Sequence, residues 1–208
     1  MDIERYLNIR SAGAPTMSPE GDRLAFLLDT TGVPQIWLLD AAESWPDQLT
    51  FYDERVTFVD YSPTNPEIAF GMDEGGNERE QFYRLDPESG DVTPLTDRPD
   101  AKHRWGGWSH DGLRFAFTSN RRDNAVFDVY VQGRDDAGDA ATLLHEGDGW
   151  LTVTGWSHDD TRLAINQAYS NYDQDLYVLD IESGDVRHVT PHEGDVRYYG
   201  AEWGPTGE

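Results

Sequence analysis

The chain has 208 residues and carries 40 Asp and Glu against 16 Lys and Arg, so its formal net charge is −24. Lys102 is the only lysine. Nucleic acid is excluded as a partner, because no basic stripe is present to neutralise phosphates. Disulfide and thiolate chemistry are excluded by the absence of cysteine. Dense carboxylates with almost no lysine are typical of a protein from an extreme halophile that keeps salt inside its cells, where strong salt screens their mutual repulsion.

The start of the chain shows no targeting signal. Charged residues interrupt its first ten positions, and no stretch resembles the apolar core of a signal peptide. No run of eighteen apolar residues occurs anywhere. We therefore expect a cytoplasmic protein without a membrane partner. Residues 1–12 read as a lead-in, with a possible short helix over residues 3–9.

One phrase then recurs along the chain. It consists of an aromatic or Met residue, Ser with Pro or His, a polar turn, and a short apolar strand centred on Ala. The serines of its four copies are Ser18, Ser62, Ser109 and Ser157. A period of 40 to 50 residues is typical of radially arranged or stacked units.

Each repeat predicts four strands. In the second, runs rich in Val, Ile, Phe and Tyr cover residues 57–61, 68–72, 81–85 and 92–96. In the fourth, the runs cover residues 151–156, 163–166, 175–180 and 186–190. Gly, Pro, Asn and Asp bound each run, as expected for strands joined by hairpins.

A four-stranded unit of this length is the blade of a β-propeller. The sequence therefore predicts an all-β fold, an incomplete β-propeller of about four four-stranded antiparallel blades plus the start of a fifth. The expected blades are residues 13–56, 57–102, 103–149 and 150–194. Residues 195–208 read as the start of a fifth blade, because Trp203-Gly204-Pro205 begins the repeated phrase again.

The repeated phrase resembles the PD40-type, WD40-like repeats of TolB proteins and of the N-terminal propeller of the prolyl oligopeptidase family of serine peptidases. The peptidase branch, of the acylaminoacyl peptidase and dipeptidyl aminopeptidase type, is the more similar over three segments: residues 4–11, 32–37 and 71–79. The resemblance covers all 208 residues. It implies a propeller that caps an α/β-hydrolase domain and restricts entry to short peptides.

The chain departs from this family in one respect. The family's hydrolase domain carries a G-x-S-x-G nucleophile motif, and this motif is absent from the sequence. We therefore expect a fragment without peptidase activity or cofactor of its own, whose partners are an α/β-hydrolase domain and short peptides. A stand-alone TolB-like propeller that binds a protein is the alternative, and a prematurely ended gene is a third.

Ser, His and Asp stand side by side at Ser109-His110-Asp111 and Ser157-His158-Asp159. A catalytic triad needs these groups to converge from different elements, which neighbours on one turn cannot do. Pro replaces His in the other two repeats, at Pro19 and Pro63. We interpret all four serines as structural turn residues, so no catalytic residue is assigned.

No metal site is predicted. The six histidines have no pair at the spacing of zinc ligands. The acidic pairs Asp73-Glu74 and Asp173-x-Asp175 supply oxygen ligands suited to Ca²⁺, but such pairs arise by chance among 40 carboxylates.

Two loops are candidates for a functional rim, because loops at one end of neighbouring blades converge. One breaks the repeat pattern in the second blade, and the other occupies the equivalent place in the third. The candidate substrate or docking residues are Asp73, Glu74, Asn77, Glu78, Arg79, Arg121 and Arg122. Solvated surface loops are the alternative.

Overall fold

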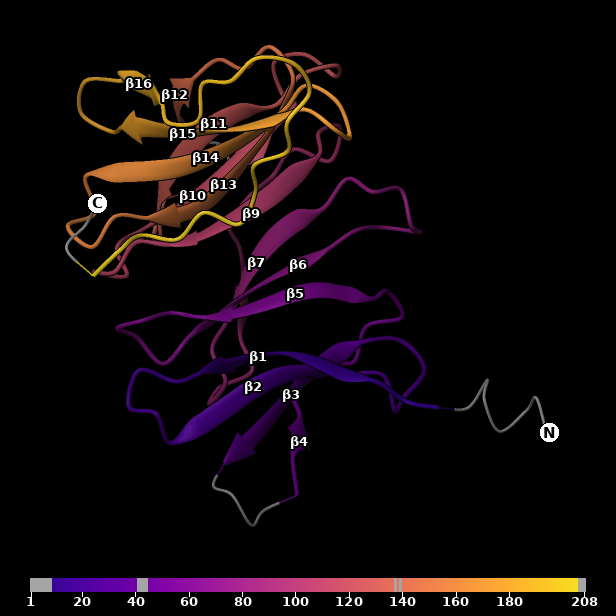
Figure 1. Cartoon of the computed structure of the whole chain (residues 1–208). Helices are drawn as coiled ribbons and strands as arrows, with labels where there is room; N and C mark the ends of the chain where they lie inside the picture. Colours follow the sequence, from indigo (N-terminus) through magenta and orange to yellow (C-terminus); the bar gives the residue numbers. More distant parts are fainter. Residues whose placement is uncertain (1–8, 41–44, 137, 139, 206–208) are drawn as a thin grey trace. The chain divides into compact units, whose positions relative to one another are not determined.

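The computed structural model describes residues 9–40, 45–136, 138 and 140–205. Within these ranges the chain forms strands and turns and contains no helix (Figure 1). The short helix expected over residues 3–9 lies, except for its last residue, outside the described part of the chain. Consequently no helix long and apolar enough to cross a membrane occurs among the described residues.

Sixteen strands form four sheets of four strands each, and every sheet follows chain order. The prediction of an all-β, incomplete β-propeller of about four blades is thereby confirmed. The first two sheets contain β1 (Ala12–Met17), β2 (Arg23–Leu28), β3 (Gln35–Asp40), β4 (Asp47–Gln48), β5 (Val56–Tyr61), β6 (Ile68–Met72), β7 (Gln81–Leu85) and β8 (Val92–Pro94). The last two contain β9 (His103–Trp108), β10 (Arg114–Ser119), β11 (Asp128–Gly133), β12 (Thr142–His145), β13 (Trp150–Trp156), β14 (Arg162–Ala168), β15 (Gln174–Asp180) and β16 (Val186–His188).

The fourth strands of the second and fourth sheets, β8 and β16, are shorter than the sequence predicts. β8 ends at Pro94 and β16 at His188, whereas the apolar runs extend two residues further. Those last two residues, Leu95-Thr96 and Val189-Thr190, instead make hydrogen bonds to the third strand without continuing the ladder. Sequence periodicity detects the apolar run but not the point at which regular pairing stops.

The first strand of each sheet has an irregular register against the second strand. The shift lies between Gly13 and Thr16 in β1, and between Val153 and Gly155 in β13, with counterparts in β5 and β9. Such a β-bulge increases local twist and bends the strand. In β1, β9 and β13 this distortion lies near the turn that carries the repeated serine, whereas in β5 it lies at the opposite end of the strand.

The chain divides into two compact units. The first comprises residues 1–78 and 83–93, and the second residues 79–82 and 94–208. In the first unit, residues of β2 and β3 pack against β5 and β6 around Ala25, Ile36, Ile68 and Phe70, all fully buried. Burial of this apolar surface is the main favourable term for folding of the unit.

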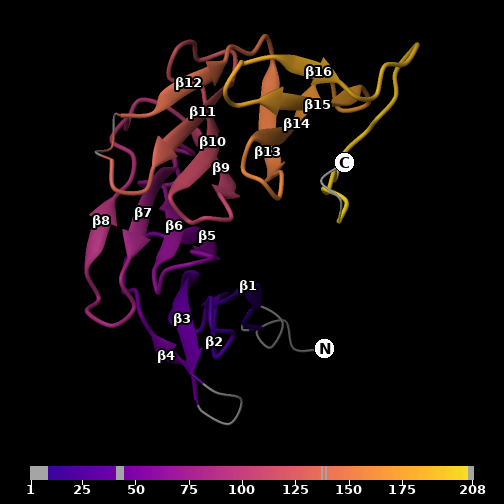
Figure 2. The same ribbon diagram turned by 90° about the vertical axis from the view of Figure 1, so that its left-hand side faces the viewer.

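The core of the second unit lies between the third and fourth sheets. β10 and β11 contribute Ala116, Val129 and Val131, which belong to one cluster with residues of the fourth sheet such as Leu163 and Ile165. Figure 2 shows β13 beside the sheet β9–β12. The two sheets approach closely at β9, where a Cβ added to Gly106 would lie 2.5 Å from Cβ of Val153. Only glycine fits there, because a real Cβ contact is never that short.

Candidate functional site

The turn after the first strand of each sheet is built around its repeated serine. In the third sheet, the buried Ser109 hydroxyl donates to Asp111 at 2.6 Å and accepts the N–H of Arg114 at 3.0 Å. In the fourth sheet, Ser157 makes the same two bonds, to Asp159 at 2.6 Å and from Arg162 at 2.9 Å. Both hydroxyls are therefore used in closing a turn, and neither is presented to a substrate.

The neighbouring histidine does not complete a triad. His110 Nδ1 lies 2.8 Å from Asp160 Oδ1, and the backbone N–H of His110 donates to the same oxygen at 2.8 Å. Asp160 comes from the equivalent turn of the next sheet, so this carboxylate joins two sheets. Hydrogen bonds from Ser157 and Thr161 lower the pKa of Asp159 to about 2. This carboxylate stays ionised and is unsuited to proton transfer near neutral pH.

A second repeated feature is the threonine that follows the fourth strand. The hydroxyls of Thr50, Thr96 and Thr190 each accept a backbone N–H from the third strand of their own sheet at 2.9 Å. In the third sheet the fourth strand itself extends to His145, which pairs with Val129. The runs predicted for the fourth strands, residues 92–96 and 186–190, end at Thr96 and Thr190, but the sequence pattern assigned these threonines no role. Each of the three threonines lies the same number of residues after its hydrogen-bond partner in the third strand. This constant separation is the feature of the sequence that could have indicated their role.

The loop over residues 73–78, in the first unit, is built on a buried carboxylate. Asp73 is 4% exposed and accepts the N–H of Glu78 at 2.8 Å. Gly75 donates its N–H to Glu54 at 3.0 Å, and both Gly75 and Glu78 have positive φ, 60° and 61°. Glu74, Asn77 and Glu78 are exposed. The loop is therefore held from beneath by Asp73 while its other polar side chains face outward.

The second predicted loop, in the second unit, contains two arginines with different surroundings. The buried carboxylate of Asp128 accepts from Arg122 Nε at 2.8 Å and Nη2 at 2.7 Å. This bidentate pair raises the pKa of Arg122. Arg122 therefore serves to neutralise Asp128 and to tie its loop to β11.

Arg121 lies over aromatic rings, with its guanidinium 4.7 Å from the Tyr130 ring and 5.1 Å from the Phe117 ring. Its Nη2 is 3.1 Å from His103 Nε2. His103 is buried, and its Nδ1 lies 2.8 Å from the carbonyl oxygen of Glu80. Burial, aided by the charge of Arg121, lowers the pKa of His103 to about 4. A neutral imidazole with Nδ1 donating can accept from Arg121, so His103 and the rings orient this guanidinium.

The predicted rim draws on both units. Asp73, Glu74, Asn77 and Glu78 belong to the first unit, whereas the three arginines Arg79, Arg121 and Arg122 belong to the second. The two loops thus lie in different units. A shared rim stays a prediction.

A cluster of histidines and carboxylates lies at the start of β15. Asp175 accepts from the Thr190 hydroxyl at 2.8 Å and lies 3.0 Å from His188 Nε2 and 3.1 Å from His192 Nδ1. Burial alone would raise the pKa of Asp175, but bonds from Thr190 and His188 bring it below its usual value. Asp173, 3.1 Å from His192 Nε2, completes the cluster. In the described ranges no three His, Asp or Glu side chains are arranged as a metal site.

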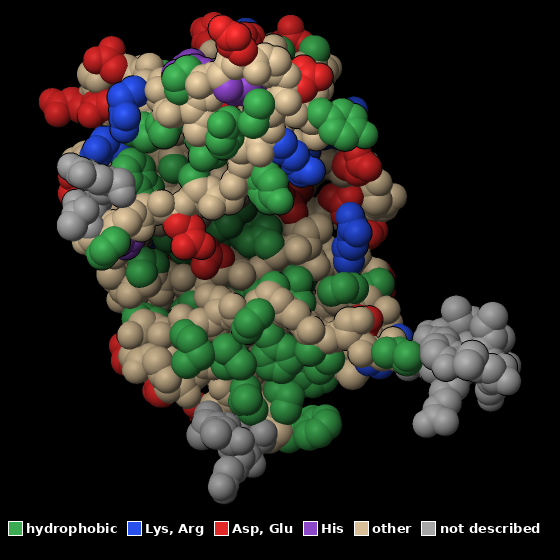
Figure 3. Space-filling view, viewed as in Figure 1, with side chains coloured by type: hydrophobic (Ala, Val, Ile, Leu, Met, Phe, Trp, Pro, Cys, Tyr) green, Lys and Arg blue, Asp and Glu red, His purple; other side chains and the backbone are tan. Residues whose placement is uncertain are grey.

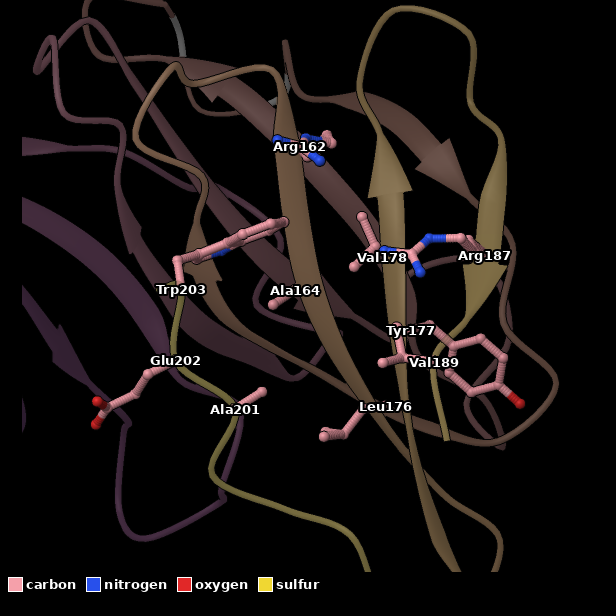
Figure 4. A pocket seen from close by; sticks show the side chains of 10 residues that line it. All are labelled: Arg162, Ala164, Leu176, Tyr177, Val178, Arg187, Val189, Ala201, Glu202 and Trp203. Atoms are coloured by element: carbon pink, nitrogen blue, oxygen red, sulfur yellow. The ribbon is translucent and has the colours of Figure 1, made fainter. Parts of the chain in front are cut away.

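Described residues of the second unit line two cavities. The larger, about 530 Å³, lies between β14–β16 and the segment 201–203, and Figure 4 shows the Trp203 indole and the aliphatic side chains of β15 around it. Arg162 and Arg187 also line this cavity. The smaller, about 300 Å³, combines an apolar floor of Leu151 and Ile165 with polar residues, including Tyr169 and Tyr177. No predicted rim residue lines either cavity.

No family model and no curated protein matches the sequence. Solved structures do match the fold. TolB from Acinetobacter baumannii is 22% identical with a TM-score of 0.66, over 89% of this chain and 45% of that one. A structure described in a study of two prolyl endopeptidases is 14% identical with a TM-score of 0.72, over 90% of this chain and 30% of that one. A puromycin hydrolase is 16% identical with a TM-score of 0.63, over 95% and 32% respectively.

These likenesses show the propeller fold. The chain spans less than half the length of each of these three structures. Both groups that the repeat motif resembles, TolB-like propellers and the propellers of prolyl oligopeptidase-like enzymes, are thus among the structural neighbours.

Proposed function

We propose that this chain is the propeller portion of a prolyl oligopeptidase-like serine peptidase, where it caps an α/β-hydrolase domain and limits entry to short peptides. The observation that carries the proposal is the loop over residues 73–78. It belongs to a segment in which the sequence resembles the peptidase propellers. Its buried Asp73 holds it in one conformation while Glu74 and Glu78 face outward. A loop fixed in this way loses little conformational entropy on binding.

In this proposal the loop offers carboxylates to a cationic group, either a peptide amino terminus or a basic side chain of the hydrolase domain. Electrostatic complementarity of this kind contributes to orientation and to association rate more than to affinity. Asp73 acts indirectly as a positioning residue. The four turn serines have no catalytic part, so the chain contributes access and docking, and the hydrolase domain contributes the chemistry.

The proposal is tested by titrating the chain, in strong KCl, with a purified prolyl oligopeptidase-type α/β-hydrolase domain and separately with short peptides that have a free amino terminus. We expect the association rate to fall about tenfold in the double variant Glu74→Gln, Glu78→Gln. The variant Glu20→Gln removes an exposed carboxylate from a turn of the first sheet and is expected to associate at the original rate. Equal association rates for all three proteins would contradict the proposed role of the loop.

Labelling with a fluorophosphonate probe checks the absence of a nucleophile in this chain. We expect no labelling. A label lost in Ser109→Ala or Ser157→Ala would overturn the structural reading of these turns.

A TolB-like role is the second candidate, supported by the 22% identity to TolB from Acinetobacter baumannii. It differs in its partner, which would be another protein bound without any hydrolase domain. Recovery of such a protein by the chain, with no affinity for the hydrolase domain or for peptides, would favour this candidate.

A further inference from the structure

The smaller cavity of the second unit, of about 300 Å³, is lined by the fourth sheet and by the segment that leads into it from β12. Leu151 and Ile165 give it an apolar floor, and Tyr169 and Tyr177 contribute two aromatic rings. The other lining residues are His145, Glu146, Asp148, Gln167 and Val186. A concave site that combines apolar and aromatic side chains with a few polar groups is typical of small-ligand binding.

The cavity occurs where the fourth sheet lacks an aromatic ring that the third sheet has. In the third sheet, Phe117 stacks on Tyr130 with ring centroids 5.5 Å apart. Ile165 holds the same place in β14 as Phe117 in β10, and each pairs in the ladder with the tyrosine of the third strand. Isoleucine has no ring to stack on Tyr177, so space remains beside this tyrosine.

In the third sheet a cation also lies against the corresponding tyrosine. The guanidinium of Arg121 is 4.7 Å from the Tyr130 ring and 5.1 Å from the Phe117 ring. At the corresponding place after β14 the sequence has Tyr169, whose hydroxyl lies 2.6 Å from that of Tyr177. The fourth sheet therefore keeps the tyrosine of the third strand but has no arginine at this place.

The lining of the cavity carries negative charge. Glu146 and Asp148 are exposed, and no Lys or Arg is among the described residues that line the cavity. Asp148 accepts a hydrogen bond from the side-chain amide of Gln167, which is neutral and leaves the charge of Asp148 in place. Arg122 lies 3.9 Å from Glu146, but its guanidinium already makes a bidentate pair with Asp128.

The loop that carries these two carboxylates is fixed through Gly147. The N–H of Gly147 donates to Asp128 at 2.9 Å, and its carbonyl oxygen accepts from Arg122 at 3.1 Å. A Cβ added to Gly147 would lie 2.1 Å from the carbonyl oxygen of Phe127, so only glycine fits there. A loop held in this way loses little conformational entropy when a ligand binds.

We infer that this cavity binds an organic cation, a guanidinium or primary ammonium group on a short aliphatic stem. The cation lies beside Tyr177, as Arg121 lies beside the corresponding tyrosine of the third sheet. Glu146 and Asp148 balance its charge, and the stem contacts the apolar floor. The inference is independent of the proposed function, whose loop belongs to the first unit.

The test is a titration of the full chain in strong KCl with n-butylguanidinium and with n-butylurea, its neutral isostere. Binding is followed by the amide NMR shifts of Gly147 and Gly149. We expect n-butylguanidinium to bind about tenfold more tightly than n-butylurea. Equal affinity for the two compounds, or no binding of either, would overturn the inference.

The peptide acetyl-Gly-Arg-Gly-amide distinguishes the two sources of such a cation. Tighter binding of the peptide than of n-butylguanidinium would support the site and identify its occupant as a basic side chain of a polypeptide. Weaker binding of the peptide would support the site and identify its occupant as a free small molecule.

A double variant, Glu146→Gln with Asp148→Asn, removes both charges, and the new amide oxygen can still accept from Gln167. Its affinity for n-butylguanidinium is expected to fall about tenfold. The matched control is Glu193→Gln, which removes an exposed carboxylate elsewhere in the second unit and should leave the affinity unchanged. Unchanged affinity in the double variant would overturn the inference.

The variant Tyr169→Arg supplies the arginine that the third sheet has at this place. Its guanidinium should occupy the cavity and reduce the affinity for n-butylguanidinium about tenfold, whereas Tyr169→Gln, with a neutral side chain, should retain binding. Equal effects of the two substitutions would overturn the placement of the cation beside Tyr177. Tyr169 is exposed, so both variants should fold, and the comparison of the two butyl compounds on the original protein needs no variant.

Discussion

The third and fourth sheets carry the same types of residue on corresponding faces, yet one of these faces is more deeply buried than the other. Ala116 and Val129 of the third sheet are fully buried, whereas at the corresponding positions of the fourth sheet Ala164 is 7% exposed and Leu176 is half-buried. The difference arises from what covers each face in the described part of the chain: a whole sheet covers the third sheet, and residues 196–205 cover the fourth. Burial in a repeat protein is thus decided by the neighbour, and equivalent substitutions should have unequal effects.

The first sheet offers a related case within its own unit. Ala25 of β2 and Ile36 of β3 face the second sheet and are fully buried, whereas Leu24, Phe26 and Leu28 of β2 are half-exposed. Figure 3 shows hydrophobic side chains gathered over β1 and β2. In this sheet too, the face packed against another sheet is the buried one.

The largest contrast is expected from a charge placed at Val129 or at Leu176. Val129→Asp buries an unpaired carboxylate between two sheets and should lower the free energy of unfolding by about 4 kcal/mol. Leu176→Asp places the same charge at a half-open face and should cost less than about 1 kcal/mol. Urea unfolding of both variants at the same KCl concentration measures the two losses in the free energy of unfolding. Equal losses would contradict the comparison.

The next prediction concerns the pH dependence of stability. His103 in the third sheet and His192 beside the fourth should contribute to it in opposite senses. The pKa of His103 falls from its usual 6.5 to about 4 when the protein folds. The unfolded chain therefore binds the extra proton between these values, and stability falls by about 3 kcal/mol as pH decreases from 6.5 to 4. His103→Gln should flatten this part of the stability curve.

His192 should act in the opposite sense. Hydrogen bonds to Thr190 and Asp173 raise its pKa. Its contribution is therefore complete below pH 6.5 and is lost as pH rises through the raised pKa. The urea midpoints of the original protein and of His192→Gln, compared between pH 5 and 9, measure the contribution of His192 to stability. A destabilisation that grows with pH would contradict it.

A smaller difference is expected between the two tryptophans. Trp156→Phe removes a buried donor to Gly107 and leaves space in the core, at a cost of about 2 kcal/mol. Trp203 makes the same bond from a half-exposed position, so Trp203→Phe should cost about 0.5 kcal/mol. Thermal unfolding of the two variants, with the loss of each indole's fluorescence as a check, tests this order. The order of the two losses would be reversed if residues 196–205 contributed more to the packing of the core than the fourth sheet does.

The smallest difference between the two sheets is expected at the turn serines, where the two losses should be equal. Ser109→Ala and Ser157→Ala each leave a backbone N–H without its hydroxyl acceptor and should each cost about 1 kcal/mol. Because both hydrogen bonds of each serine hydroxyl lie within its own turn, we expect the loss to be independent of what covers the face of the sheet. Unequal losses would show that the turns depend on the neighbouring sheet after all.

Particular residues show how far the sequence could be interpreted. The recurring Ser62, Ser109 and Ser157 located the turns, and the apolar runs beside them located the strands. The sequence did not reveal that Arg122 would pair with Asp128, because Asp128 belongs to a run of alternating residues and its burial depends on the sheet packed above it. Nor did it reveal that Asp160 would bind His110, since the partner lies one repeat away.

The predicted rim illustrates the same limit. Glu74, Asn77 and Glu78 are exposed, in line with a surface loop, but Asp73 is buried and holds the loop from below. No local pattern separates Asp73 from the acidic residues that follow it. Its role depends on the fold of the loop, with two glycines and Glu78 at positive φ.

The sequence by itself determined the repeat, the four-stranded sheets and the turns, because these follow from local periodicity and from the conformational preferences of Gly, Asp and Ser. Only the tertiary structure decided which of the repeated apolar faces is covered and which carboxylates are buried. The physical reason is that the alternation along a strand fixes the face to which a side chain points, whereas its burial depends on a second sheet packing against that face.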